Sequence, residues 1–447
     1  MNNKAWLQRS LDSVWHPCTQ MKQHPALPLV PIARGEGIWL EDFEGKRYLD
    51  GISSWWVNLF GHGNPEINAA ITDQLSRLEH VMLAGFTHAP AIELAERLSA
   101  RTGDILGHAF FASDGASATE IALKMSFHAW QNAGQTEKCE FVCLSGSYHG
   151  ETIGALSVTD IPLFSEAYAQ LVRSEHVHLA PSPDARLAQP GETAIDVANH
   201  AANALEQLFK ERQGKIAAII IEPLVQCATG MAMHDPHYLK RVRALCNEHQ
   251  VHLICDEIAV GFGRTGSFFA HEQAGIRPDL LCLSKGITGG YLPLSVVLCG
   301  EAIYQAFWHD DTRRGFLHSH SYTGNPLACR AALATLDIFE KHDVLGANRK
   351  LSAHITQRLR AIAMHSRVKN FRHRGMIWAA DVDTDLPDFN RRFFAQALQR
   401  GLLMRPIGNT IYLMPPYILT TAEADWMADQ ALAALNATLA EAPVEHA

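Results

Sequence analysis

The sequence of 447 residues predicts an α/β protein, with a large domain on a mostly parallel sheet and a smaller α+β domain. Short apolar runs alternate with helical segments along much of the chain, which is typical of a sheet covered by helices on both faces. Polar residues follow the ends of these runs, where such sheets collect their functional groups. The length also exceeds what a single hydrophobic core usually fills, so we expect two domains.

The first 65 residues are predicted to form an irregular arm that belongs to the smaller domain. A strand pattern at residues 37–42 leads into a turn within the segment FEGKRYLD (43–50). The opening stretch, Met1 to Leu11, is polar and has no apolar signal core, which favours a cytoplasmic protein.

Residues 66–330 are predicted to form the large domain. Helical periodicity covers residues 65–81 and 89–100. Apolar, β-rich runs then recur between turn residues, at 109–113, 140–146, 216–223, 251–257 and 280–286. Residues 331–447 begin with a helical pattern at 332–342, and we expect them to complete the smaller domain together with the arm.

The composition argues against several classes of protein. The net charge of −9 arises from 38 basic and 47 acidic residues with no cluster of either sign, so no nucleic-acid partner is expected. The longest apolar runs, such as 216–221, are too short to span a membrane. Nine scattered cysteines without a CxxC pair, and 24 histidines without an HExxH-type cluster, predict no metal site.

Lys285 and Asp256 are the main candidates for chemistry. An amine at a strand end in an apolar setting loses its proton readily and can form a Schiff base with an aldehyde. A lone lysine closing a strand is more often a surface residue. Asp256 changes that balance, because it ends a neighbouring run and could pair with a protonated pyridine nitrogen. A helix cap, or an ion pair with Arg264, is the alternative for Asp256.

The segment 112–120 leads from an apolar run into a helix. Its small residues, including Gly115 and Ala116, allow close approach of a phosphate, and a helix N-terminus offers unpaired N–H groups. A capping box formed by Ser117 and Glu120 is a second interpretation, compatible with the first.

Several further residues have both a functional and an ordinary interpretation. Tyr148 could stack on a flat cofactor or simply close the core, and Glu222 could anchor a polar network. Trp55 and Trp56 offer an apolar wall, although adjacent tryptophans more often serve packing. Arg405 could bind a carboxylate through two parallel hydrogen bonds, or it could be solvated.

Together these motifs resemble the class III aminotransferases of pyridoxal-phosphate (PLP) fold type I. The resemblance covers nearly the whole chain and is most specific in DEIAVGFGRTGSFFAHEQAGIRPDLLCLSKGITGGYLPLSVVL (256–298) and HSHSYTGNPLAC (318–329). A finer resemblance is to the adenosylmethionine–8-amino-7-oxononanoate aminotransferases of biotin biosynthesis. Its carriers are WHPCTQMK (15–22), SSWWVN (53–58), SYHGET (147–152) and IYLMPPYI (411–418).

The resemblance implies roles for residues around the cofactor. Lys285 is expected to carry PLP and to shuttle the proton, and Asp256 to hold the pyridine nitrogen. Gly115 and Ala116 are expected to bind the phosphate through their backbone, while Tyr148 covers the ring and touches substrate.

The resemblance also implies a homodimer with shared active sites and a set of substrate-binding residues. His320 and Ser321 are expected to reach the phosphate of the other subunit. The substrate pocket is expected to include Trp55, Trp56, Ser319, Arg405, Tyr412 and Cys18, besides Tyr148 and Lys285. Arg405 is the expected partner of the substrate carboxylate, with Tyr412 beside it.

Two positions depart from the family pattern. Cys18 stands where some members have a tyrosine that helps to recognise substrate, so one hydroxyl is absent. Ala116 stands where some have serine, which removes one side-chain contact to the phosphate but leaves the backbone N–H groups.

The reaction implied is transfer of an amino group from a donor, expected to be S-adenosylmethionine, to 8-amino-7-oxononanoate, giving 7,8-diaminononanoate. Another class III ω-aminotransferase, acting on an ω-amino acid or a diamine, is the main alternative. A PLP aminomutase or racemase on the same scaffold, and a non-catalytic PLP-binding protein, are further alternatives. The last of these normally lacks the lysine that is present here.

Overall fold

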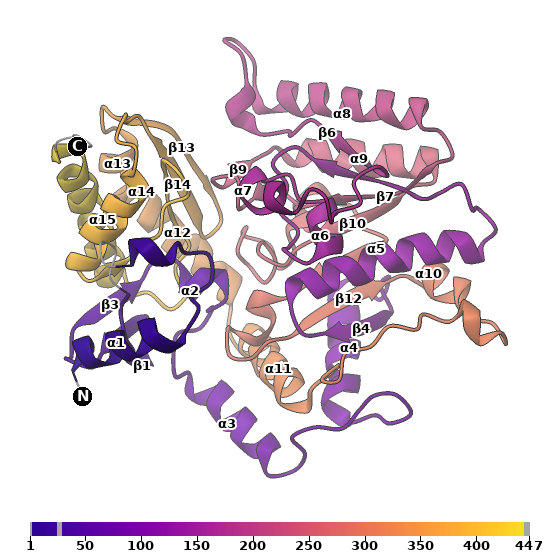
Figure 1. Ribbon diagram of the computed structural model, residues 1–447, viewed down its shortest axis with the longest axis horizontal. Helices are drawn as coiled ribbons and strands as arrows, with labels where there is room; N and C mark the ends of the chain where they lie inside the picture. Colours follow the sequence, from indigo (N-terminus) through magenta and orange to yellow (C-terminus); the bar gives the residue numbers. More distant parts are fainter. Residues whose placement is uncertain (1, 25–28, 442–447) are drawn as a thin grey trace. The chain divides into compact units, whose positions relative to one another are not determined.

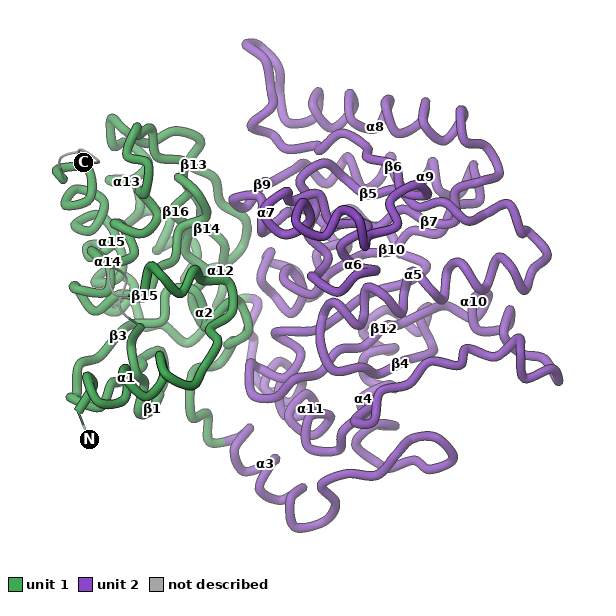
Figure 2. Tube along the Cα trace, viewed as in Figure 1, with its two compact units in different colours: residues 1–65, 346–447 green, residues 66–345 purple. Residues whose placement is uncertain are grey.

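The computed structural model describes residues 2–24 and 29–441 and divides into two compact units (Figure 2). Unit 1 comprises Met1–Pro65 and Gly346–Ala447, and unit 2 comprises Glu66–Leu345. The later boundary lies beyond the expected one at 330/331, because helix α11 (Pro326–Lys341) packs against α4 (Ala89–Arg101) within unit 2. Arg97 of α4 forms an ion pair of 2.7 Å with Asp337 of α11, which fastens the two helices together.

Unit 2 is built on a seven-stranded sheet in the order β4-β12-β11-β10-β7-β5-β6 (Figure 1). Its strands are β4 (His108–Ala112), β5 (Glu140–Leu144), β6 (Val177–Ala180), β7 (Ile216–Ile221), β10 (His252–Asp256), β11 (Leu280–Leu283) and β12 (Ser295–Cys299). Neighbours are parallel from β11 through to β6, whereas β12 is antiparallel to both β11 and β4; of the seven described strands, β12 alone therefore runs in the opposite direction. The predicted mostly parallel α/β sheet is confirmed.

Helices cover this sheet because each presents an apolar side to it. Helix α5 (Gly115–Asn132) runs along the sheet (Figure 1). Its residues Ile121 and Met125 join the core with Ile220, Ile254 and Val297 of the strands. The α-helices of unit 2 are α3 (Pro65–Leu75), α4, α5 (Gly115–Asn132), α6 (Ile153–Ser157), α7 (Pro162–Ser165), α8 (Ala194–Glu211), α9 (Pro236–His249), α10 (Glu301–Ala306) and α11. Among the helices of the described residues, none is long and apolar enough to cross a bilayer.

Helix α3 ends earlier than its periodicity predicts. The pattern extends to residue 81, but the helix stops at Leu75. The chain then tightens into short turns, with the Arg77 and Leu78 N–H groups both donating to the Gln74 carbonyl. The Gln74 side chain donates in turn to the Leu78 carbonyl (2.8 Å), which satisfies a backbone group that a longer helix would have used.

Unit 1 joins the two ends of the chain in one sheet of order β1-β2-β3-β15. Strand β15 pairs parallel with β3, so that Leu402 faces Leu49 and Leu403 faces Asp50. A second sheet has the order β13-β14-β16. The strands are β1 (Ile32–Glu36), β2 (Trp39–Asp42), β3 (Arg47–Asp50), β13 (Val368–Arg374), β14 (Ile377–Val382), β15 (Leu402–Leu403) and β16 (Thr410–Leu413). The main helices are α1 (Asn3–Ser13), α12 (Val344–Arg358), α14 (Phe389–Gln399) and α15 (Thr421–Ala440), with short turns at α2 (Ser53–Trp56) and α13 (Arg360–Ala363).

Candidate active site

The polar residues of unit 2 gather at the carboxyl ends of neighbouring strands. Strand β10 lies between β7 and β11, so Asp256 at its end, Glu222 after β7 and Lys285 after β11 come from three adjacent strands. In the register of the sheet, Asp256 pairs with Cys282, three residues before Lys285. Such a convergence at the carboxyl edge is where α/β sheets bind ligands.

Asp256 is buried and held by two donors. The Nδ1 atom of His149 lies 2.7 Å from one carboxylate oxygen, and the Ile258 N–H donates to the other (3.0 Å). The His149 side chain is completely buried, and its Nε2 atom has no hydrogen-bond partner among the described residues. Sequence analysis did not single out His149, and its position beside Tyr148 was the only available signal.

Lys285 lies at the turn that follows β11, in an unusual backbone conformation. Its φ is +46°, a value that residues other than glycine rarely adopt. Burial lowers the pKa of the Lys285 amine, while Asp256, Cys227 and Glu222 oppose this effect. The net result favours a neutral amine more than in a solvated lysine, as a nucleophile or base requires.

Glu222 holds two backbone segments beside Asp256 and Lys285, one at Tyr148 and one at Cys227. Its two oxygens accept hydrogen bonds from the Tyr148 N–H and the Cys227 N–H, each of 3.0 Å. Burial, assisted by the nearby Asp256 charge, raises the pKa of Glu222 to about 7, and His149 partly offsets the rise. Glu222 therefore fixes the backbone that carries Tyr148.

Helix α5 starts at Gly115, three residues earlier than the predicted capping box requires. The cap is Asp114, whose carboxylate accepts from both the N–H and the hydroxyl of Ser117 (2.9 and 3.0 Å). Glu120 accepts instead from the Gly154 N–H (3.0 Å), so the expected Ser117–Glu120 box is wrong. The first N–H groups of α5, at Gly115 and Ala116, have no intrahelical acceptor and suit an anion.

Gly150 fits closely against this first turn of α5. A Cβ atom at Gly150 would lie 2.5 Å from the Ala116 Cβ, and the φ of +129° is also one that favours glycine. On the other side, a Cβ at Gly115 would meet the Ile258 side chain at 3.0 Å. The start of α5 is thus held between segments that follow β5 and β10.

Strained backbone follows each of the three strands that end at this site. Leu224 after β7, Phe262 after β10 and Lys285 after β11 all have positive φ, at +67°, +54° and +46°. Each such residue costs on the order of 1–3 kcal/mol and persists where the surroundings impose it, most often at functional sites.

Unit 1 holds most of the expected substrate-binding residues. The Arg405 guanidinium lies over the Trp55 ring, 4.9 Å from its centroid, and donates to the Cys18 carbonyl (2.8 Å). The Trp56 Nε1–H donates to the Tyr412 hydroxyl (3.2 Å). The structure therefore pairs Arg405 with Trp55 and with the Cys18 backbone, and it pairs Trp56 with Tyr412.

Ser319, His320 and Ser321 lie in the irregular segment 316–325 of unit 2. Ser319 and Ser321 are exposed, and the His320 N–H donates to the Thr323 hydroxyl (3.1 Å) in a local turn. Within one chain, Ser319 and Ser321 therefore lie on the surface, and His320 between them is half-buried.

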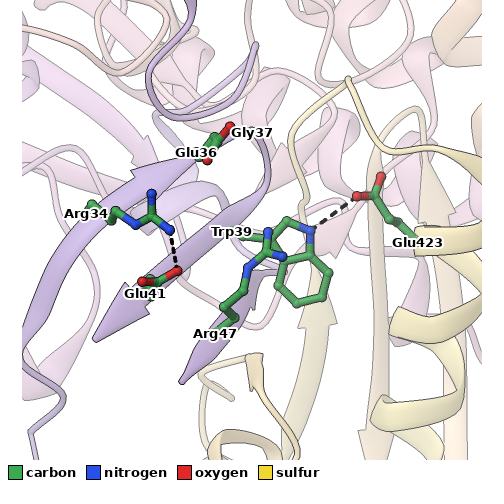
Figure 3. Close-up of a pocket in the computed structure, with 7 residues that line it drawn as sticks. All are labelled: Arg34, Glu36, Gly37, Trp39, Glu41, Arg47 and Glu423. Atoms are coloured by element: carbon green, nitrogen blue, oxygen red, sulfur yellow. Dashed lines mark hydrogen bonds and ion pairs between the residues drawn. The ribbon is translucent and has the colours of Figure 1, made fainter. Parts of the chain in front are cut away.

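A surface cavity of about 460 Å³ in unit 1 contains none of the expected residues (Figure 3). Arg47 lies over the Trp39 ring, and the Trp39 Nε1–H donates to Glu423 (3.2 Å). Arg34 pairs with Glu41 at 2.8 Å. The described lining contains no lysine that could bind an aldehyde, so this cavity does not compete with the strand-end site.

The residues of the strand-end site fit PLP. A partly buried amine of lowered pKa, a buried carboxylate on the adjacent strand, and the unpaired N–H groups of α5 match the aldehyde, ring nitrogen and phosphate of the cofactor. The buried His149 Nε2 without a partner indicates that the polar network around Asp256 extends to a further group.

Comparison with known proteins agrees with this chemistry. The family model for aminotransferase class-III matches residues 19–435. An adenosylmethionine-8-amino-7-oxononanoate aminotransferase from Helicobacter pylori is 46% identical over 92% of this chain and 93% of its own length. The same-named protein of Methanocaldococcus jannaschii has a crystal structure with a TM-score of 0.90 at 33% identity, covering 98% of this chain and 99% of that one.

A crystal structure of an (S)-enantioselective omega-transaminase from Thermomicrobium roseum is also similar, with a TM-score of 0.93 at 30% identity over 98% of this chain and 99% of that one. Class III aminotransferases depend on PLP, and solved neighbours contain it or its amine form. On this evidence the chain belongs to the class III aminotransferase family and is a PLP-dependent transaminase of fold type I.

Proposed function

We propose that this transaminase transfers an amino group to 8-amino-7-oxononanoate and so makes 7,8-diaminononanoate for biotin biosynthesis. The observation that carries the proposal is the similarity to relatives named for this reaction along nearly the whole chain. Relatives of that name from Geobacter sulfurreducens and Anoxybacillus flavithermus are 39% and 40% identical over 93% and 94% of this chain.

PLP, when bound, supplies an aldehyde that accepts the donor's amino group and a ring that withdraws electrons from the carbon to be deprotonated. Lys285 would hold the aldehyde and then, as a neutral amine, take a proton from the substrate carbon and deliver it to the cofactor. Asp256, fixed by His149, would keep the ring nitrogen protonated. Gly115 and Ala116 would hold the phosphate, and Tyr148 would cover the ring.

The substrate carboxylate is assigned to Arg405 in this proposal. One edge of the guanidinium donates to the Cys18 carbonyl and its face lies on Trp55, which leaves the other edge for a ligand. No carboxylate of the described residues forms an ion pair with Arg405. A planar guanidinium fixed in this way can bind a carboxylate through two parallel hydrogen bonds. Trp56, Ser319 and Tyr412 are proposed to complete the substrate contacts.

The amino donor is proposed to be S-adenosylmethionine. Cys18 contributes its backbone carbonyl to the Arg405 contact, and its exposed side chain occupies the position where some members carry a tyrosine. The hydrogen bond from Arg405 to the Cys18 carbonyl does not depend on the side chain at position 18. Arg405 can therefore keep its position with cysteine in place of the tyrosine.

A homodimer is part of the proposal. The segments 79–88 and 316–325 contact one another within the chain, as the rings of His80 and Tyr322 lie 4.9 Å apart. Together they expose Met82, Phe86, Leu317 and Tyr322, with Leu317 76% exposed. We propose that these exposed apolar side chains, on two segments that contact one another, form the apolar surface of a dimer interface; His320 and Ser321 lie on one of the two segments.

A cytoplasmic location is also proposed. All nine cysteines lie in the described part of the chain and are free, and seven of them are buried. Free cysteines in this number are typical of a reducing compartment.

The decisive experiment mixes the purified enzyme with 8-amino-7-oxononanoate and, in parallel, S-adenosylmethionine, lysine or a simple ω-amine, and measures 7,8-diaminononanoate. We expect product with at least one donor and none when the donor is omitted. If no donor gives 7,8-diaminononanoate, and the enzyme instead turns over ω-amines with pyruvate, the ω-aminotransferase alternative is favoured. The structural similarity to omega-transaminases is the observation that keeps this alternative in view.

A further inference from the structure

The backbone of residues Ser53–Trp56 forms a left-handed turn. Four successive residues, none of them glycine, have φ of +52°, +46°, +74° and +73°. Such runs are rare because the Cβ atoms crowd the following carbonyl oxygens. Something outside the turn must therefore hold it in place.

Asp50 supplies that hold from the end of β3. Its side chain is completely buried, and its two oxygens accept from the Ser54 N–H (2.8 Å) and the Ser54 hydroxyl (2.7 Å). The second oxygen also lies 3.0 Å from the His62 Nε2 atom. Ser54 is itself exposed, so its hydroxyl is used inward although solvent was available to it.

The two residues beside Ser54 and Trp55 are fixed separately. The Ser53 hydroxyl donates to the Met414 carbonyl (2.8 Å), and the Trp56 indole donates to Tyr412. Ser53 and Trp56 are buried, whereas Trp55 is 43% exposed. The exposed indole of Trp55 thus projects from a turn whose flanks are pinned, and its direction depends on the backbone at Ser54.

The Trp55 ring is the platform on which the Arg405 guanidinium rests. If the turn relaxed to ordinary right-handed angles, the Trp55 side chain would leave this position and the guanidinium would lose its planar support. Orientation of the guanidinium decides whether it can form two parallel bonds to a carboxylate.

We propose that Asp50, acting through Ser54, is a positioning residue for carboxylate recognition: it holds the left-handed turn that keeps the Trp55 indole under Arg405. The inference rests on the proposed role of Arg405 in binding a substrate carboxylate. It assigns a specificity role to two residues that touch neither the cofactor nor the reacting carbon.

The test compares Ser54→Ala with Ser54→Gly in the holoenzyme. Alanine removes the hydroxyl anchor and keeps the backbone strain, whereas glycine removes the hydroxyl but adopts positive φ without cost. Binding of 8-amino-7-oxononanoate and of its methyl ester, which lacks the carboxylate charge, is measured by calorimetry. We expect Ser54→Ala to weaken binding of the acid at least about 10-fold and Ser54→Gly by no more than about 3-fold, with the ester unchanged in both.

A matched control is Ser352→Ala, which removes another inward-pointing hydroxyl of unit 1, bonded to the Gly375 carbonyl (2.6 Å) and remote in sequence from the turn. It should leave the preference for acid over ester unchanged. Equal losses for alanine and glycine would mean direct contact of the hydroxyl with substrate and would overturn the proposal. So would equal weakening of acid and ester, or a wild-type enzyme that binds the two alike.

Turnover separates this inference from the proposed function. A wild-type enzyme that binds the acid with the expected pattern of variants but forms no 7,8-diaminononanoate refutes the proposed reaction and leaves the positioning role standing. Normal wild-type turnover, together with unchanged binding of the acid by Ser54→Ala, would support the proposed reaction and refute the positioning role.

Discussion

Lys285 and Lys138 show how much the surroundings of a lysine decide its chemistry. Burial lowers the pKa of both amines. Lys138 donates to the Gln250 carbonyl and lies over the Trp130 ring, so its amine is committed to packing. Lys285 instead lies within the electrostatic influence of Asp256 and Glu222 at the strand ends. Of these two lysines, Lys285 is therefore the candidate for chemistry.

Lys285→Ala is therefore expected to abolish turnover while the fold is retained. General acid–base catalysis alone contributes up to about 10⁴-fold, so we expect kcat to fall by at least about 10³-fold. Steady-state kinetics, with circular dichroism to verify folding, measures this. Lys138→Ala serves as the control and should lower stability but not kcat. Activity of Lys285→Ala within about 10-fold of wild type would remove Lys285 from the mechanism.

Glu222 gives a prediction about pH and stability. Its pKa rises from 4.5 to about 7 on folding, so between these values the folded protein binds more protons than the unfolded chain. The contribution of Glu222 to the free energy of unfolding must then decrease as pH rises through this window. Glu222→Gln cannot titrate, so its stability relative to wild type should increase by up to about 3 kcal/mol from pH 4.5 to 7.

Urea denaturation of the holoenzyme at several pH values measures this difference. Glu248→Gln, which alters an exposed carboxylate of α9, should give a curve parallel to wild type. If the stability of Glu222→Gln also varies with pH in parallel with wild type, folding does not raise the pKa of Glu222.

At the scale of elements, the contact between Gly150 and the first turn of α5 predicts a change in cofactor affinity. In Gly150→Ala the new methyl group would displace Ala116, whose N–H is proposed to bind the phosphate. We expect the Kd for PLP to rise at least about 10-fold, equivalent to the loss of about one hydrogen bond to a charged group. Spectroscopic titration of the apoprotein with PLP measures the change.

Gly107→Ala is the matched control, because a Cβ at Gly107 would meet no atom within 4 Å. It makes the same chemical change just before β4 in the same unit. Equal affinities in the two variants would show that the first turn of α5 does not hold the phosphate.

The elements that carry this chemistry were predictable to the extent that they depend on local pattern. Apolar runs of strand length located β7, β10 and β11, and parallel strands necessarily bring Asp256 and Lys285 to one edge. The His149–Asp256 bond was not predictable, because it joins residues 107 positions apart and the sequence around His149 carries no mark of it. The helix cap at Asp114 was missed because Ser117 and Glu120 also satisfy the capping pattern.

The left-handed turn at Ser53–Trp56 lies beyond any local signal. Positive φ normally occurs at glycine or asparagine, and SSWW contains neither. At roughly 1–2 kcal/mol per residue the turn costs several kcal/mol, which contacts to Asp50, Met414 and Tyr412 must offset. Two of these partners lie more than 350 positions away in sequence, so only the folded chain reveals them.

For the whole molecule, the apolar surface formed by segments 79–88 and 316–325 predicts a dimer that a single charge can disrupt. Leu317→Lys places an ammonium group in this surface, and we expect sedimentation velocity to show a monomer. Activity should fall at least about 10-fold with it, because His320 and Ser321 are proposed to act in the other subunit.

Met364→Lys is the control for this change, since Met364 of unit 1 has the same exposed fraction of 76%. It should sediment as wild type. A Leu317→Lys protein that remains dimeric would place the interface elsewhere.

The distribution of cysteines has a practical consequence. Of the nine, all within the described residues, Cys18 alone is exposed. A maleimide dye added to the folded enzyme should therefore attach at one place without any engineering. Because the Cys18 carbonyl contacts Arg405, the emission of that dye offers a direct view of ligand arrival, independent of the absorbance of the coenzyme.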